Sequence, residues 1–148
     1  MKNDKVLIAG IIGALSTIPS EIVSQILVSL GYAPYSNFDL SSLIITGTRP
    51  SLIMGLFVSS VVGGLIGVLL YLAFIKLGSE HLIIKSIATS ILMWVALEFV
   101  FTILIEGKLI PVRPISGYYS HLFSAIIYGI LMEYCLINFY FINLSIMT

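Results

Sequence analysis

Residues 50–75 of the chain read PSLIMGLFVSSVVGGLIGVLLYLAFI, a stretch without any Asp, Glu, Lys or Arg. An α-helix rises about 1.5 Å per residue, so about 20 such residues cross a hydrocarbon layer about 30 Å thick. Three other stretches are comparably long and apolar, namely residues 6–30, 84–105 and 118–142. Because a backbone in lipid has to satisfy its own hydrogen bonds, each stretch is predicted to be a helix. The sequence therefore predicts an all-α fold, an integral membrane four-helix bundle that forms a single transmembrane domain over residues 1–148.

The composition points the same way. The chain is 59% hydrophobic and only 9% charged, with a mean hydropathy of +1.12. Soluble domains carry about 25% charged residues, so the polar surface that water requires is missing. Seven Lys and Arg balance seven Asp and Glu, without a basic cluster, which argues against nucleic acid as a partner. The expected partner is the lipid bilayer.

The distribution of Lys and Arg bears on orientation. With both termini on the same side, that side would hold Lys2, Lys5, Lys76 and Lys85, and the other side Arg49, Lys108 and Arg113. Cytoplasmic loops carry an excess of basic residues, so this small difference favours cytoplasmic termini. We expect a multi-pass protein of the plasma or inner membrane.

Gly and Pro residues mark the connections between the predicted helices, at residues 31–37, 78–81 and 106–114. A short amphipathic segment is expected at residues 40–46, with Asn37 or Asp39 as its cap. The outer connections hold charged residues that are expected as interfacial charges at any helix end, and the alternative is a docking surface for a partner; they are Asp39, Arg49, Glu106, Lys108 and Arg113.

Small residues follow one face of the second predicted helix, because Gly55, Ser59, Gly63 and Gly67 recur at steps of four. Lipid tails are as apolar as Leu, so close backbone contact through small residues replaces the usual hydrophobic drive between helices. This helix-packing face is expected either to lie inside the bundle or to contact another chain. In the second case the protein would be a homo-oligomer or would bind a partner membrane subunit.

The other three predicted helices each carry a stripe of small and polar residues at the same spacing. The stripes are Gly13, Thr17, Glu21, Gln25 and Ser29; Ser86, Ser90, Trp94, Glu98 and Thr102; and Gly117, His121, Ala125, Gly129 and Glu133. Each stripe is expected to face the bundle interior. Each also contains one carboxyl group, from Glu21, Glu98 or Glu133.

An acidic side chain near the bilayer centre costs about 2.5 to 3.5 kcal/mol, so three of them require an explanation. No Lys or Arg is expected at the same depth, and burial without a counter-charge favours the protonated form. One explanation is structural: the carboxyl groups hydrogen-bond across helices. The other is functional: Glu21, Glu98 and Glu133 bind a proton or a cation. In that case the supporting ligands would be Thr17, Gln25 and Thr102.

We therefore hypothesise a proton- or cation-linked transport or channel element. The alternative is a non-catalytic accessory or scaffold subunit of a membrane complex. Signatures of hydrolases, metalloproteases and phosphate-binding loops are missing from the sequence. His81 and His121 are predicted on opposite membrane faces, and Cys135 is the single cysteine. We expect no enzymatic activity, no metal and no cofactor.

Four short motifs suggest a family. Ala9-Gly10-Ile11-Ile12-Gly13 lies in the first predicted helix, Leu70-Tyr71 ends the second, and Met93-Trp94 and Tyr128-Gly129 lie in the third and fourth. In this order the chain resembles uncharacterised small bacterial membrane proteins of the YqhR type. The resemblance implies four helices and no known activity.

Overall fold

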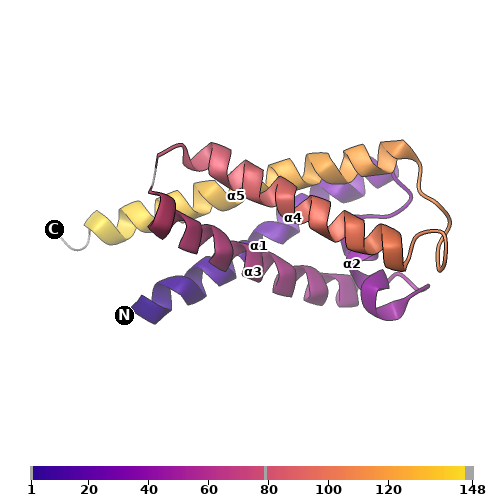
Figure 1. The fold of residues 1–148 in the computed structure, drawn as a ribbon, viewed down its shortest axis with the longest axis horizontal. Helices are drawn as coiled ribbons and strands as arrows, with labels where there is room; N and C mark the ends of the chain where they lie inside the picture. Colours follow the sequence, from indigo (N-terminus) through magenta and orange to yellow (C-terminus); the bar gives the residue numbers. More distant parts are fainter. Residues whose placement is uncertain (1, 79, 146–148) are drawn as a thin grey trace.

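The computed structural model describes residues 2–78 and 80–145, with side chains described for residues 5–76, 78 and 80–138. Within this part the chain forms five helices: α1 (Lys2–Ser29), α2 (Asn37–Thr46), α3 (Leu52–Leu77), α4 (Leu82–Leu104) and α5 (Ile115–Ser145) (Figure 1). The all-α prediction is therefore confirmed. The side chain of Lys2, which enters the orientation argument, lies outside the described part.

Four of these helices are long and apolar enough to cross a membrane, over Lys5–Ser29, Leu52–Lys76, Leu82–Leu104 and Ile115–Asn138. Their bounds differ by a few residues from those predicted. The start of α3 shows why: Ser51 is its N-cap and accepts a hydrogen bond from the Met54 N–H at 3.5 Å, so Pro50 precedes the helix. The start of α1 and the end of α5 lie at the same end of the bundle (Figure 1).

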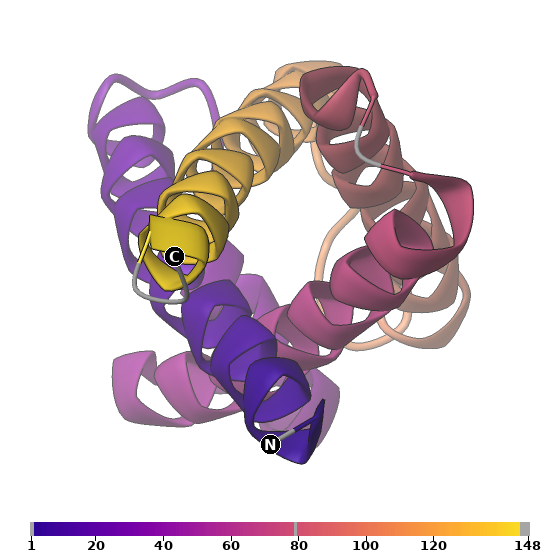
Figure 2. The same cartoon turned by 90° about the vertical axis from the view of Figure 1, so that its left-hand side faces the viewer.

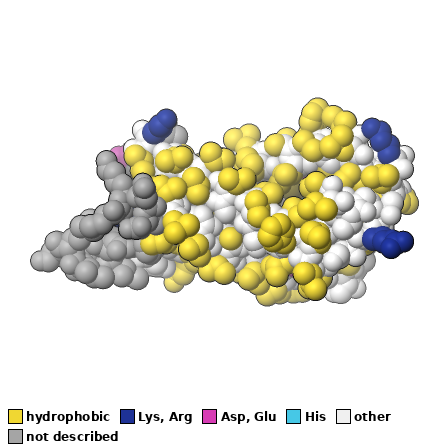
Figure 3. Space-filling view, turned by 90° about the horizontal axis from the view of Figure 1, so that it is seen from below, with side chains coloured by type: hydrophobic (Ala, Val, Ile, Leu, Met, Phe, Trp, Pro, Cys, Tyr) yellow, Lys and Arg dark blue, Asp and Glu magenta, His cyan; other side chains and the backbone are white. Residues whose placement is uncertain are grey.

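The outer surface of the bundle is strongly apolar. Large side chains such as Ile53, Leu92 and Phe99 are 80%, 69% and 67% exposed. Figure 3 shows hydrophobic side chains spread along one face, with Lys and Arg near its ends. A monomer in water rarely exposes apolar patches of this extent. The surface and the four long helices are consistent with a multi-pass membrane protein.

The long helices surround a central region (Figure 2). α1 packs most extensively on α3, and α5 packs on both α4 and α1, whereas α3 and α4 contact each other much less. Between α4 and α5 the Ser86 hydroxyl donates a hydrogen bond to the Gly129 carbonyl at 2.6 Å. Tyr128 of α5 contacts both α3 and α1, because its hydroxyl lies 2.9 Å from the Gly63 carbonyl of α3 and 3.2 Å from that of Gly13 in α1.

The small-residue face of α3 lies inside the molecule. A Cβ on Gly63 would meet the Thr17 side chain and the Gly13 carbonyl, and a Cβ on Gly55 would meet the backbone of Phe38. The Ser59 hydroxyl donates to the Ser41 hydroxyl at 2.8 Å. This face is therefore occupied by α1 and α2, and a second copy or partner subunit would have to bind elsewhere.

The short segment expected at residues 40–46 is confirmed as part of α2, which begins earlier, at Asn37. Ser36 is its N-cap, not Asn37 or Asp39. The Ser36 hydroxyl accepts from the Asp39 N–H at 3.2 Å, and the Asp39 carboxylate accepts from the Ser36 N–H at 3.1 Å. This capping box satisfies two backbone donors at the helix start. Asn37, the residue that follows the cap, makes its side-chain contacts with Ser20 and His121.

Candidate functional site: an internal cavity

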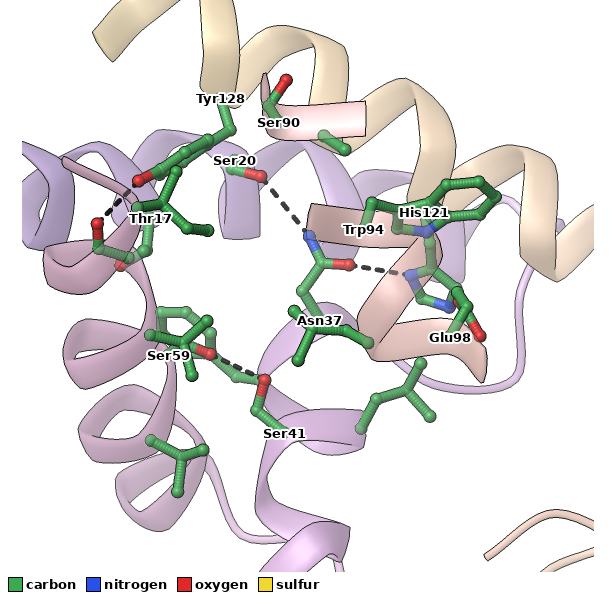
Figure 4. Close-up of a pocket in the computed structure, with 18 of the residues that line it drawn as sticks. Thr17, Ser20, Asn37, Ser41, Ser59, Ser90, Trp94, Glu98, His121 and Tyr128 are labelled. Atoms are coloured by element: carbon green, nitrogen blue, oxygen red, sulfur yellow. Dashed lines mark hydrogen bonds between the residues drawn. The ribbon is translucent and has the colours of Figure 1, made fainter. Parts of the chain in front are cut away.

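A cavity of about 160 Å³, partly open to the outside, lies between α3 and α4 and is also lined by residues of α1, α2 and α5. Its wall is mostly apolar, with contributions from Val62 and Ile66 of α3 and Phe101 of α4. The polar side chains that line it are shown in Figure 4: Thr17, Ser20, Asn37, Ser41, Ser59, Ser90, Trp94, Glu98, His121 and Tyr128. The cavity is thus an apolar chamber with polar groups from all five helices.

A chain of hydrogen bonds fixes the His121 ring in the cavity wall. The Ser20 hydroxyl donates to the Ser124 carbonyl at 2.9 Å, and the Asn37 side-chain N–H donates to the Ser20 oxygen at 3.4 Å. His121 Nδ1 lies 2.8 Å from Asn37 Oδ1. An amide oxygen only accepts, so Nδ1 carries the hydrogen and Nε2 of the neutral ring is an acceptor.

Two ring nitrogens in this wall have no hydrogen-bond partner among the described residues. They are His121 Nε2 and Trp94 Nε1, and both atoms are buried. His121 is only 2% exposed. The first nitrogen is an acceptor and the second is a donor. Buried polar groups nearly always have a partner, so these two nitrogens are unusual among the described side chains that line the cavity.

The third polar feature of the wall is the Glu98 carboxylate, which is paired with Arg113. Arg113 Nη2 lies 2.6 Å from Glu98 Oε2 and 3.1 Å from Glu106 Oε2. The Arg113 backbone N–H also donates to Glu106 Oε1 at 2.6 Å. The guanidinium carbon lies 4.7 Å from the Phe101 ring centroid and 4.6 Å from that of Tyr118, so the cation is held between two aromatic rings.

The expectation that no cation lies at the depth of the carboxyl groups is wrong for Glu98, and the expectation that Glu106 and Arg113 are ordinary interfacial charges is wrong because both are buried. The reason is the fold of the connection between α4 and α5. Gly107 has φ 73°, and its N–H donates to the Ile110 carbonyl at 2.8 Å, which turns the chain back on itself. Arg113 is 4% exposed and Glu106 is 8% exposed, whereas Lys108 at the tip is exposed.

Glu106 and Arg113 lie outside the four long apolar spans, and their pKa values reflect this pairing. Burial alone would raise the pKa of Glu106, but hydrogen bonds from the Tyr118 hydroxyl and from Arg113 hold it below its ordinary value. Burial likewise opposes the charge on Arg113, and hydrogen bonds to Glu98 and Glu106 raise its pKa. The cluster therefore holds a carboxylate and a guanidinium as ions.

The predicted site residues do not meet at one point. Thr17 and Glu98 line the cavity, whereas Glu21, Gln25, Thr102 and Glu133 are outside its lining. Glu21 accepts hydrogen bonds from Gln25 Nε2 at 2.7 Å and from the Phe38 N–H at 2.9 Å, and so anchors the start of α2. The Thr102 hydroxyl donates to Glu106 at 3.3 Å.

Glu133 is 4% exposed on α5, and it makes no hydrogen bond or ion pair with the described residues. Among those residues no group of three or more His, Cys, Asp or Glu side chains is arranged to hold a metal ion.

The site residues that sequence reasoning missed are Asn37, Glu106 and Arg113. The position of Arg113 between Pro111 and Pro114 was the available signal, because prolines rigidify the backbone on both sides of it.

Comparison of the chain with protein-family models, with curated proteins and with solved structures gives no match. The resemblance to the YqhR type therefore depends on the four short motifs alone.

Proposed function

We propose that the protein is a multi-pass protein of the cell membrane, with four membrane-spanning helices and cytoplasmic termini, and that it acts as a proton-linked transport element. The four long apolar helices and the exposed hydrophobic side chains support the membrane location. The transport proposal depends on one observation, the cavity between α3 and α4 whose wall contains the Glu98 carboxylate. A titratable group beside a cavity at membrane depth is typical of proton and substrate pathways.

Glu98 is the carboxyl group that the geometry favours as the proton carrier. It lines the cavity and its side chain is 12% exposed, so a proton has access to it. Glu21 and Glu133, by contrast, lie outside the cavity lining. Because Glu98 is paired with Arg113, a proton or a metal cation has to compete with the guanidinium for the same oxygens; a proton needs only one of them, whereas a metal ion needs further ligands.

The ion pair offers a way to couple protonation to movement. A proton on Glu98 cancels its charge and weakens the contact with Arg113, which keeps Glu106 as its partner. Glu98 belongs to α4, whereas Arg113 belongs to the connection that leads into α5. Protonation therefore loosens α4 from that connection at one end of the cavity, which is the kind of switch that alternating access needs.

The test uses purified protein in liposomes that contain a pH-sensitive dye, with a pH gradient imposed across the membrane. We expect wild-type protein to dissipate the gradient faster than empty liposomes, and Glu98→Gln to lose most of this activity. Glu133→Gln is the matched control, because Glu133 is also buried on a long helix but does not line the cavity. Wild-type flux equal to that of empty liposomes, or full flux in Glu98→Gln, would refute the proposal.

A further inference from the structure

The cavity wall has an unused donor and an unused acceptor. The Trp94 Nε1–H and the His121 Nε2 lone pair are buried and have no partner among the described residues. In Figure 4 the two rings lie on the same side of the cavity, next to Glu98. A buried polar group without a partner costs about 1 to 3 kcal/mol, so a ligand that satisfies both gains binding energy.

A hydroxyl group is the smallest chemical group that matches this pair, since its oxygen accepts one hydrogen bond while its hydrogen is donated in another. An ammonium group has no acceptor for Trp94, and a carboxylate has no hydrogen for His121. The charge of the wall points to the same ligand, because the Glu98 carboxylate is already neutralised by Arg113. The two groups of the wall that have no partner, Trp94 Nε1–H and His121 Nε2, are thus uncharged.

The rest of the cavity defines the body of the ligand. The lining away from the two nitrogens is mainly apolar and includes Val58, Val62 and Ile66 of α3 and Phe38 of α2. The volume of about 160 Å³ is on the scale of the roughly 150 Å³ that holds benzene in an enclosed apolar cavity, and here one side is open. A ring or a short branched chain fills such a space.

We propose that the cavity binds a small neutral alcohol or phenol, whose hydroxyl oxygen accepts from Trp94 Nε1–H and whose hydroxyl hydrogen is donated to His121 Nε2. This inference names the class of substrate for the proposed transport function. It rests on that function only because it treats this cavity as the substrate site. Water alone fits the polar end but leaves the apolar end unfilled.

The test compares two probes that differ in the hydroxyl alone. Binding of para-fluorophenol and para-fluorotoluene to the protein in lipid nanodiscs is followed by fluorine NMR, with empty nanodiscs to correct for partition into lipid. We expect saturable binding of para-fluorophenol and about tenfold or weaker affinity for para-fluorotoluene. Equal affinity for the two probes, or no saturable binding of para-fluorophenol, would overturn the proposal.

Two variants locate the hydrogen bonds. Trp94→Phe removes the donor and His121→Phe removes the acceptor. Each is expected to weaken para-fluorophenol binding about tenfold while leaving para-fluorotoluene binding unchanged. Tyr134→Phe, on an exposed position of α5, is the matched control and is expected to bind both probes like wild type. If one cavity variant does not fold, the other still tests its own hydrogen bond. Unchanged discrimination in a folded variant would contradict the assignment.

The flux experiment separates this inference from the proposed function. If para-fluorophenol binds selectively but Glu98→Gln leaves proton flux intact, the transport proposal fails and the ligand site stands. If flux depends on Glu98 but the two probes bind equally, the ligand class fails and the transport proposal stands.

Discussion

Arg113 Nη2 lies 2.6 Å from Glu98 Oε2, so a residue of the connection between α4 and α5 is bound to a carboxylate within α4. The same nitrogen lies 3.1 Å from Glu106 Oε2. A single buried guanidinium therefore holds two carboxylates and fixes how the connection lies against the helix. Loss of the guanidinium leaves two negative groups without their partner.

The first prediction concerns this cation. Arg113→Met is expected to lower the free energy of unfolding by about 3 to 5 kcal/mol, because it leaves buried carboxylates unpaired. The measurement is reversible denaturation in detergent micelles. Lys108→Met, at an exposed position in the same connection, is the control and should change stability by less than about 0.5 kcal/mol. Equal losses in the two variants would show that Arg113 is not a stabilising partner.

The second prediction concerns pH. The pKa of Glu106 is lower in the folded protein than its ordinary value, so the stability it contributes is fully present above that ordinary value. This contribution is lost as the pH falls through the folded pKa. We therefore expect the free energy of unfolding to decrease on acidification, and Glu106→Gln to show a shallower decrease together with a lower stability at neutral pH. Identical pH profiles for the two proteins would contradict the assignment.

The third prediction tests the contact between α1 and α3. A Cβ on Gly13 would collide with the Gly63 carbonyl, whereas a Cβ on Gly10 meets Val68 at 3.4 Å, an ordinary contact. Gly13→Ala is expected to destabilise the protein by about 1 to 3 kcal/mol, and Gly10→Ala, on the same helix, by much less. Thermal unfolding of the two variants in the same detergent measures the difference. A larger loss in Gly10→Ala would contradict this packing.

The fourth prediction assigns Glu21 a structural role. Its carboxyl group accepts from the Phe38 N–H at 2.9 Å and so holds the start of α2. Glu21→Leu is expected to speed hydrogen exchange in α2 roughly tenfold or more, because the hydrogen bond that holds the Phe38 N–H is lost. Glu133→Leu, another buried carboxyl replacement, should leave exchange in α2 unchanged. Protection of α2 equal to wild type in Glu21→Leu would disprove the anchor.

The long helices were predictable because length and apolarity are local properties of the sequence. Residues 52–75 carry no charge and have to form a helix wherever a membrane surrounds them. The stripe spacing also placed Trp94 with Glu98 on one face of the third predicted helix, and both line the cavity. The helical period of 3.6 residues per turn decides which residues share one face of a helix.

The rest of the site depends on contacts between distant residues. Asn37 contacts His121 across 84 positions of the sequence, a pairing that depends on how α2 packs against α5. Arg113 reaches Glu98 only because the chain turns back at Gly107. The orientation argument counted Arg113 among the charges at the membrane surface, because the residues next to it in the sequence do not indicate that two carboxylates surround it. Contacts of this kind, between residues far apart in the sequence, can be seen only in the folded structure.

The most direct test of the account is whether Glu98 takes up a proton in the membrane. Infrared difference spectroscopy of the protein in lipid bilayers, recorded between neutral and acidic pH, detects the C=O band of each newly protonated carboxyl group. We predict that one component of this band is absent in Glu98→Gln and retained in Glu133→Gln. A difference spectrum of Glu98→Gln identical to that of wild type would show that Glu98 does not carry the proton.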